Sequence, residues 1–248
     1  MRIALFLVLT LVVVAACNKQ TETYPSDSVA DYLPLQTGKY ITYRLDSTVF
    51  TNFGITTEVH SYQEKNVVDA QITDAAGKPS YRILRYLRAA NASATDGWSA
   101  SGSYFVTLDS NKAEVVENNL RIIKLSKPVV KHFSWKGNSY LAPDPYSSIY
   151  NFDNDKYMPD WDYTYTGVGE TTNINGKPYN NVIIVQAIAD SINVPITVPA
   201  AYARINKSID QYSKGLGLIN QELTMWEYQP NGRYMVGFGV KRSIIDHN

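Results

Sequence analysis

Residues 39–50 of the chain read Lys-Tyr-Ile-Thr-Tyr-Arg-Leu-Asp-Ser-Thr-Val-Phe. Apolar side chains such as Ile41 and Tyr43 alternate with polar ones, and this period of two predicts a strand with one buried face. Residues 52–54, Asn-Phe-Gly, have the composition of a turn, and a second long segment runs from about 55 to 73. Because only a short turn separates the two segments, they are predicted to pair as antiparallel strands.

Further strand segments lie on both sides of a long connection. Before it they occupy residues 80–89, 104–109 and 114–125, and after it residues 162–173, 181–189, 217–228 and 233–245. Asn175-Gly176, between two of these segments, is the dipeptide most typical of a tight hairpin. The sequence therefore predicts a single all-β domain over residues 32–248, with antiparallel meanders that form a curved half-barrel or a sandwich.

Residues 202–212 fit two structures. The spacing of Tyr202, Ile205 and Ile209 fits a helix, and Lys214-Gly215 would end that helix well. We predict a strand instead, because helical patterns are nearly absent elsewhere and the glycines that follow suit a turn between paired strands.

The connection over residues 126–161 is long and rich in aromatic and acidic residues. Loops of this length within a compact domain are often functional. A short helix is predicted to begin at Asp144-Pro145, with the aspartate as N-cap and the proline in the first turn. Aromatic rings in such a segment either close the open end of a sheet or bind a ligand. The candidate ligand-binding residues are Trp135, Tyr146, Tyr150, Tyr157, Trp161 and Tyr163.

The carboxylates of residues 144–162 support three sharper hypotheses. Four positions have the spacing of ligands in a twelve-residue calcium loop, namely Asn151, Asp153, Asp155 and Asp162. That loop needs a glycine where this chain has Lys156. Acidic groups beside aromatic rings also suit a glycan site, and a carboxylate pair could catalyse glycoside hydrolysis. A solvated acidic loop explains the same residues, so we predict no metal site and no reaction here.

Composition and motifs exclude several functional classes. The chain has 23 basic and 23 acidic residues, so it lacks the basic surplus that nucleic-acid binding requires. Its three histidines, His60, His132 and His247, lie far apart and show no metal-ligand spacing. The sequence contains no nucleophile elbow, zinc-protease motif, phosphate-binding glycine loop or dinucleotide fingerprint. We therefore expect a protein that is not an enzyme and uses no cofactor.

The N terminus carries the most specific signal in the chain. Residues 1–16 combine Arg2, an apolar stretch and two small residues, which is typical of a secretory signal peptide and too short to span a bilayer. Residues 14–17, Val-Ala-Ala-Cys, resemble the lipobox of bacterial lipoproteins, with valine in place of the commoner leucine. The resemblance implies cleavage before Cys17, the only cysteine, and attachment of acyl chains to it. Each buried CH₂ of such a chain contributes about 0.8 kcal/mol to membrane attachment.

Two further stretches extend this resemblance. Residues 32–43, Tyr-Leu-Pro-Leu-Gln-Thr-Gly-Lys-Tyr-Ile-Thr-Tyr, and residues 212–219, Tyr-Ser-Lys-Gly-Leu-Gly-Leu-Ile, are similar to an uncharacterised family of envelope lipoproteins of Gram-negative bacteria. This family has no assigned activity. The resemblance implies an outer-membrane protein of the cell envelope, held by its lipid. The polar composition of residues 17–31 predicts a tether between the lipid and the folded domain.

Three functions remain open for the folded domain. We expect a non-enzymatic binding or carrier module for a lipid, a glycan or a protein ligand. One alternative is an accessory subunit of an envelope complex. The other is a glycan-active hydrolase that uses aspartates of residues 144–162.

Overall fold

The alternating segment at 39–50 forms strand β1 (Tyr40–Thr51) in the computed structural model, which describes residues 26–248. Strand β2 (Thr56–Thr73) pairs with it in antiparallel register, so that Tyr43 lies opposite Glu64. The turn between them contains Asn52 and Phe53, which both have positive φ angles, of 48° and 55°. The predicted hairpin is therefore present.

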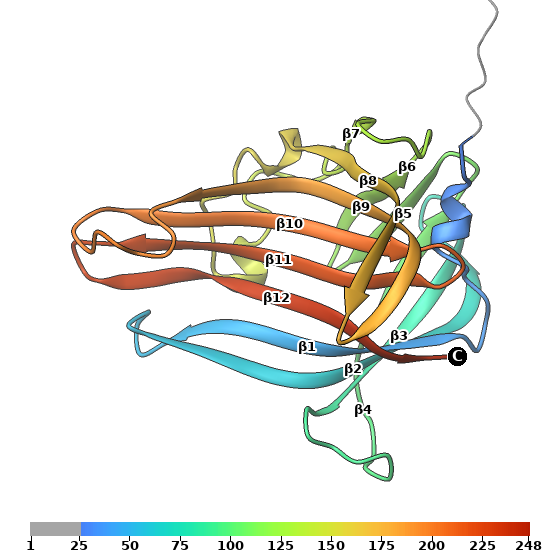
Figure 1. Ribbon diagram of the computed structural model, residues 1–248, viewed down its shortest axis with the longest axis horizontal. Coiled ribbons are helices and arrows are strands. Elements are labelled where there is room, and N and C mark those ends of the chain that lie inside the picture. The colour runs from blue at the N-terminus through green and yellow to red at the C-terminus, as the bar shows by residue number, and fades with distance from the viewer. Residues whose placement is uncertain (1–25) are drawn as a thin grey trace, which may run out of the picture.

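The remaining strands continue the antiparallel pattern (Figure 1). They are β3 (Pro79–Ala89), β4 (Ser99–Leu108), β5 (Lys112–Glu117), β6 (Leu120–Ser126), β7 (Ser134–Lys136), β8 (Asp162–Ile174), β9 (Lys177–Ile192), β10 (Ala203–Ser213), β11 (Gly217–Gln229) and β12 (Tyr234–His247). Over the described residues they form one twelve-stranded sheet with the order β6-β5-β4-β3-β2-β1-β12-β11-β10-β9-β8-β7. The predicted all-β class and antiparallel meanders are confirmed.

The sheet curls into a nearly closed barrel rather than a sandwich. Pairing of β1 with β12 joins the N-terminal and C-terminal meanders. Shifts of register interrupt several strand pairs, for example between Gln211 and Tyr212, and such bulges increase twist and curvature. The two ends of the sheet approach one another where the Ile123 N–H donates to the Gly137 carbonyl at 2.8 Å. The Trp135 indole also donates to the Ile123 carbonyl at 2.8 Å.

The folded part begins before Tyr32, the boundary predicted from sequence. A 3₁₀ helix, η1 (Val29–Tyr32), packs Val29 and Tyr32 into the core, and Asp27 forms a bridge with Val129. Residues 27–31, which the sequence assigned to the tether, thus belong to the domain because an apolar residue and a tyrosine anchor them. The signal peptide, Cys17 and the first part of the tether lie outside the described residues.

Two local predictions have different outcomes. Residues 202–212 form a strand, β10, as predicted, and it pairs with both β9 and β11.

The short helix of the long connection, α2 (Ser147–Tyr150), begins three residues after Asp144. Tyr146 is its N-cap, while Asp144 has a φ of 52° and does not cap it, so the predicted helix start is wrong. A second short helix, η2 (Met158–Asp160), ends the connection.

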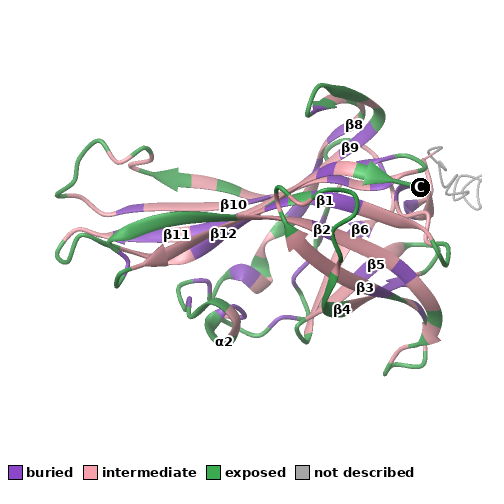
Figure 2. Ribbon diagram, turned by 90° about the horizontal axis from the view of Figure 1, so that it is seen from below, coloured by how far each residue is buried: buried purple, intermediate pink, exposed green. Residues whose placement is uncertain are grey.

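Much of the long connection packs against the inner side of the barrel. We call residues 137–161 the plug segment. Its buried side chains Tyr146, Phe152 and Met158 share an apolar cluster with Met225 and Phe238 of the sheet. Helix α2 lies to one side of β11 and β12 in Figure 2. Tyr146 and Phe152 of this segment therefore cover part of the sheet, whereas Tyr140 and Tyr157 are exposed. Within residues 26–248, no helix has the length and apolarity needed to cross a membrane.

Candidate functional site

The interior of the barrel holds a cavity of about 210 Å³. Inward-facing residues of β1–β6 and β10–β12 form its wall, together with the plug segment and the stretch that follows η1. The end near η1 is apolar and includes Leu33, Leu35, Val68 and Leu216. A cavity of roughly 150 Å³ holds a benzene molecule, so this one admits a small molecule or one part of a larger amphiphile.

A chain of charged and amide side chains runs around the inside of the barrel. We call it the polar belt, and its members are Glu64, Arg85, Glu117, Lys124, Asp210, Gln221 and Arg242. They come from β2, β3, β5, β6, β10, β11 and β12, so the belt connects strands from both meanders. The belt can run around the barrel because inward-facing residues of neighbouring strands lie side by side at a similar height along the barrel axis.

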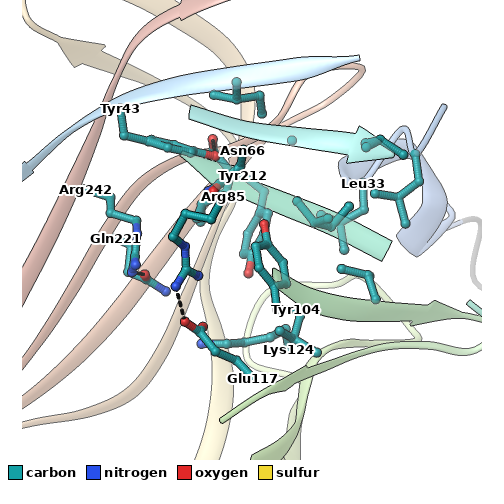
Figure 3. Close-up of a pocket in the computed structure, with 18 of the residues that line it drawn as sticks. Leu33, Tyr43, Asn66, Arg85, Tyr104, Glu117, Lys124, Tyr212, Gln221 and Arg242 are labelled. Carbon is teal, nitrogen blue, oxygen red and sulfur yellow. Dashed lines mark hydrogen bonds and ion pairs between the residues drawn. The ribbon is translucent and has the colours of Figure 1, made fainter. Parts of the chain in front are cut away.

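Glu64 is the centre of one half of the polar belt. Its carboxylate, 1% exposed, accepts hydrogen bonds from Arg242 Nε at 2.8 Å and Arg242 Nη2 at 3.1 Å. Arg85 Nε lies 3.5 Å from Glu64 Oε2, and Arg85 Nη1 lies 2.7 Å from Glu117 Oε1 (Figure 3). Two arginines from different strands thus share one buried carboxylate.

Asp210 is the centre of the other half. Arg242 Nη1 donates to Gln221 Oε1 at 2.6 Å, and Gln221 Nε2 donates to Asp210 Oδ1 at 2.9 Å. Lys124 Nζ donates to Asp210 Oδ2 at 2.9 Å. The amide of Gln221 therefore links the Glu64 half of the belt to the Asp210 half.

Pairing favours the charged forms of Glu64 and Lys124 in the polar belt. Burial alone would raise the pKa of the Glu64 carboxyl, but Arg242, Arg85 and Asn66 hold it below its usual value. Burial alone would lower the pKa of Lys124, but Asp210 raises it above its usual value. A buried charge without such a partner costs several kcal/mol. The belt is therefore a set of buried ion pairs that depend on one another.

The structure brings only two of the six candidate aromatic residues to the cavity. Tyr146 and Tyr150 form part of its wall at the plug end. Trp135 and Tyr163 are core residues near the junction of the sheet ends, with ring centroids 5.9 Å apart. Trp161 packs beside the plug cluster, and Tyr157 is 68% exposed on the surface.

The structure does not gather the acidic residues of the connection into a calcium loop. Asp155 is buried, Asp153 is exposed, and Asp162 forms an ion pair with Lys136 at 2.9 Å. Among the described residues, no group of three or more histidine, cysteine or acidic side chains could hold a metal. None of the aspartates of residues 144–162 belongs to the wall of the cavity.

Asp155 and Asp144 are nevertheless close to each other. The Asp155 N–H donates to Asp144 Oδ1 at 3.1 Å, and Asp155 is only 4% exposed. Burial and the neighbouring Asp144 carboxyl raise the pKa of Asp155 from 3.8 to about 7. Asp155 therefore holds a proton in the folded protein at a pH where the unfolded chain has released it.

We expect this proton to make stability depend on pH. Because the folded pKa lies above the unfolded one, the stability of the wild type relative to Asp155→Asn falls as the pH rises from about 4 to about 7. The slope is at most about 1.4 kcal/mol per pH unit. Urea unfolding of both proteins between pH 4 and 8 measures it. A difference between the two that does not change with pH would contradict the raised pKa.

Sequence reasoning missed the polar belt. One signal was available: Arg85 alternates in phase with Ile83 and Leu87, so it had to point to the same side of the sheet as two apolar residues. The pairings within the belt could not be identified in the same way, because partners such as Glu64 and Arg242 are 178 positions apart.

Comparison with known proteins gives no assignment of function. No protein family matches the sequence, and no curated protein matches it. A provisionally described exported protein with a YmcC-like fold from Bacteroides fragilis is 12% identical, with a TM-score of 0.28 over 85% of this chain and 97% of the other. A DUF1329 family protein from Desulfovibrio piger is 12% identical, with a TM-score of 0.22 over 90% and 93%.

A third solved structure is a domain from Vibrio parahaemolyticus, provisionally described as an outer membrane lipoprotein-sorting protein domain. It is 9% identical, with a TM-score of 0.20 over 85% of each chain. Because all three TM-scores are below 0.5, the function of this chain has to be inferred from its own cavity and sequence.

Proposed function

We propose that the protein is a lipid-anchored binding module of the bacterial cell envelope, which holds a small ligand inside its barrel and performs no reaction on it. The cavity of about 210 Å³ carries this proposal, because its wall combines an apolar end with a polar belt. Ligand sites commonly combine apolar walls with a few polar groups that orient the ligand. The cavity suits a small lipid, a glycan unit or part of either, and it is too small for a folded protein.

The anchor is the second part of the proposal. The lipobox-like residues 14–17 support acylation at Cys17 and attachment to the outer membrane. Intact-mass measurement of the full chain, expressed in a Gram-negative host, tests it. We expect a mass that lacks residues 1–16 and includes acyl chains. An uncleaved chain or a free thiol at Cys17 would contradict the anchor while leaving the cavity proposal intact.

Blocking the cavity tests the ligand site. Leu35 belongs to the apolar end of the wall, so an indole ring in Leu35→Trp should fill that end. We expect binding of N-phenyl-1-naphthylamine, an uncharged apolar fluorophore, to weaken at least tenfold. Val59→Trp is the control, because Val59 is exposed on β2 and lies outside the cavity wall. Equal binding by both variants would mean that the fluorophore binds elsewhere and that the cavity is not its site.

One observation favours a second candidate, an accessory subunit of an envelope complex. Phe53, Ile55 and Val59 are all well exposed in the hairpin of β1 and β2, and Phe53 is 95% exposed. Exposed apolar residues that lie together often mark a contact with a partner. Purification of the full chain from cross-linked envelopes tests this candidate. A single stoichiometric partner cross-linked through this hairpin would support it, and recovery of the chain alone would exclude it.

A further inference from the structure

The wall of the cavity contains polar groups without partners. The side chains of Tyr104 and Tyr146 line the cavity, and within the described part of the chain neither hydroxyl group has a hydrogen-bond partner. Asn66 Oδ1 and Arg85 Nε are also buried without a hydrogen-bond partner. Buried polar groups in native proteins are nearly always hydrogen-bonded, so this wall has donors and acceptors for which the protein supplies no counterpart.

These groups lie close to the polar belt. The guanidinium carbon of Arg85 is 5.2 Å from the centre of the Tyr104 ring, and Tyr104 lies beside Arg85 in Figure 3. Tyr146 is close enough to Lys124 and Glu117 for both charges to influence its pKa, which burial raises most strongly. A ligand group at this level of the barrel would therefore meet two tyrosine side chains that lie next to charged groups of the polar belt.

The charges of the polar belt favour a neutral ligand group. Arg85, Lys124 and Arg242 are balanced by Glu64, Glu117 and Asp210, and each of the six has an opposite charge within 3.5 Å. An anionic ligand would bring its charge close to carboxylates that are already paired, and a cationic ligand close to paired cations. A buried charge without a partner of its own is costly. A neutral group that both donates and accepts hydrogen bonds fits without such a cost.

The rest of the wall sets the position of the ligand's apolar part. Leu33, Leu35, Ile41, Val68 and Leu216 surround the end of the cavity near η1. Gly215 and Asn248, at the same end of the wall, are exposed to solvent. An amphiphile would therefore place its polar head at the belt and its apolar part among these side chains.

We propose that the cavity binds a neutral amphiphile whose head group carries hydroxyls, with the head against Tyr104, Tyr146, Asn66 and Arg85 and the apolar part toward Leu33 and Leu35. This inference rests on the proposed function and specifies its ligand class. Hydroxyl is the group that best matches the wall, because one hydroxyl can both donate to and accept from the hydroxyl groups of Tyr104 and Tyr146.

The first experiment compares probes that share a ten-carbon chain and differ in the head group. Binding of 1-decanoylglycerol, decyl glucoside, decanoate and decyltrimethylammonium to the full chain is measured by calorimetry at pH 7, below the micelle concentration of each. We expect at least one of the two neutral probes to bind ten times more tightly than either ion. The better neutral probe identifies a glycerol or a sugar head.

The second experiment removes one hydroxyl at a time. We expect Tyr104→Phe and Tyr146→Phe each to weaken binding of the better neutral probe roughly two- to tenfold, the range for one hydrogen bond. Binding of N-phenyl-1-naphthylamine, which has no hydroxyl, should not change, and this also shows that the cavity is intact. Tyr157→Phe is the matched control, because Tyr157 is exposed outside the cavity.

The outcomes separate the two proposals. Tighter binding of decanoate or decyltrimethylammonium than of both neutral probes would overturn the neutral head group and leave the ligand cavity standing. Unchanged binding of the neutral probe by both cavity variants would also overturn it. If none of the probes binds and N-phenyl-1-naphthylamine does not bind either, the proposed function itself fails.

Discussion

Replacing Glu64 with glutamine is expected to lower the free energy of unfolding by about 3–5 kcal/mol, the usual cost of removing one partner from a buried ion pair. The carboxylate of Glu64 is 1% exposed and bonds to Arg242 through both of its oxygens. Arg85 also lies between Glu64, at 3.5 Å, and Glu117, at 2.7 Å. The neutral amide leaves both guanidinium groups buried with less compensation. Urea denaturation at pH 7 measures the loss.

A matched substitution on the surface shows whether burial is the cause. Glu170 Oε1 lies 3.8 Å from Lys131 Nζ, and both side chains are about half exposed. Glu170→Gln should change stability by no more than about 1 kcal/mol, because solvent screens such a pair. If Glu64→Gln had an equally small effect, the polar belt would not hold the two meanders together.

Phe238→Ala is expected to cost about 3–5 kcal/mol and to loosen the plug segment. The Phe238 ring is stacked on Tyr150 with centroids 3.8 Å apart, and its centroid lies 5.0 Å from that of Tyr146 and 6.2 Å from that of Phe152. This one ring therefore contacts three aromatic rings of the plug segment, and alanine leaves a cavity beside all of them. Thermal unfolding measures the stability, and amide hydrogen exchange measures the opening of residues 146–152.

Tyr157→Ala provides the comparison within the same segment. Tyr157 is 68% exposed, so its removal should change stability by about 0.5 kcal/mol or less. We expect faster exchange over residues 146–152 only in Phe238→Ala. Unchanged exchange there, together with a large loss of stability, would show that Phe238 supports the sheet and not the plug.

The strands could be predicted because their signals are local. Alternation over residues 39–50 requires only that one face of a strand is buried, and β1 follows it. Asn175-Gly176 predicted a hairpin because both residues adopt positive φ readily. In the structure their φ angles are 52° and 82°, and they join β8 to β9.

The folded start of the domain and the roles of the aromatic residues could not be predicted in this way. The polar composition of residues 17–31 predicted a tether, but Val29 and Tyr32 are both buried and anchor η1 in the core. Among the candidate aromatic residues, Trp135 is buried on β7 where the sheet ends meet, and Tyr157 is exposed in the plug segment. The tertiary path of the chain decides which of these rings are covered.

The sequence by itself determined that the chain is an antiparallel all-β protein and predicted a lipid anchor at Cys17, because strand periodicity, turn composition and the lipobox are patterns between near neighbours. Only the tertiary structure decided that the sheet encloses a cavity with a polar belt around it. The belt joins residues as far apart in sequence as Glu64 and Arg242. Lys124 of β6 meets Asp210 of β10 only because the curvature of the sheet brings these two distant strands within hydrogen-bond distance.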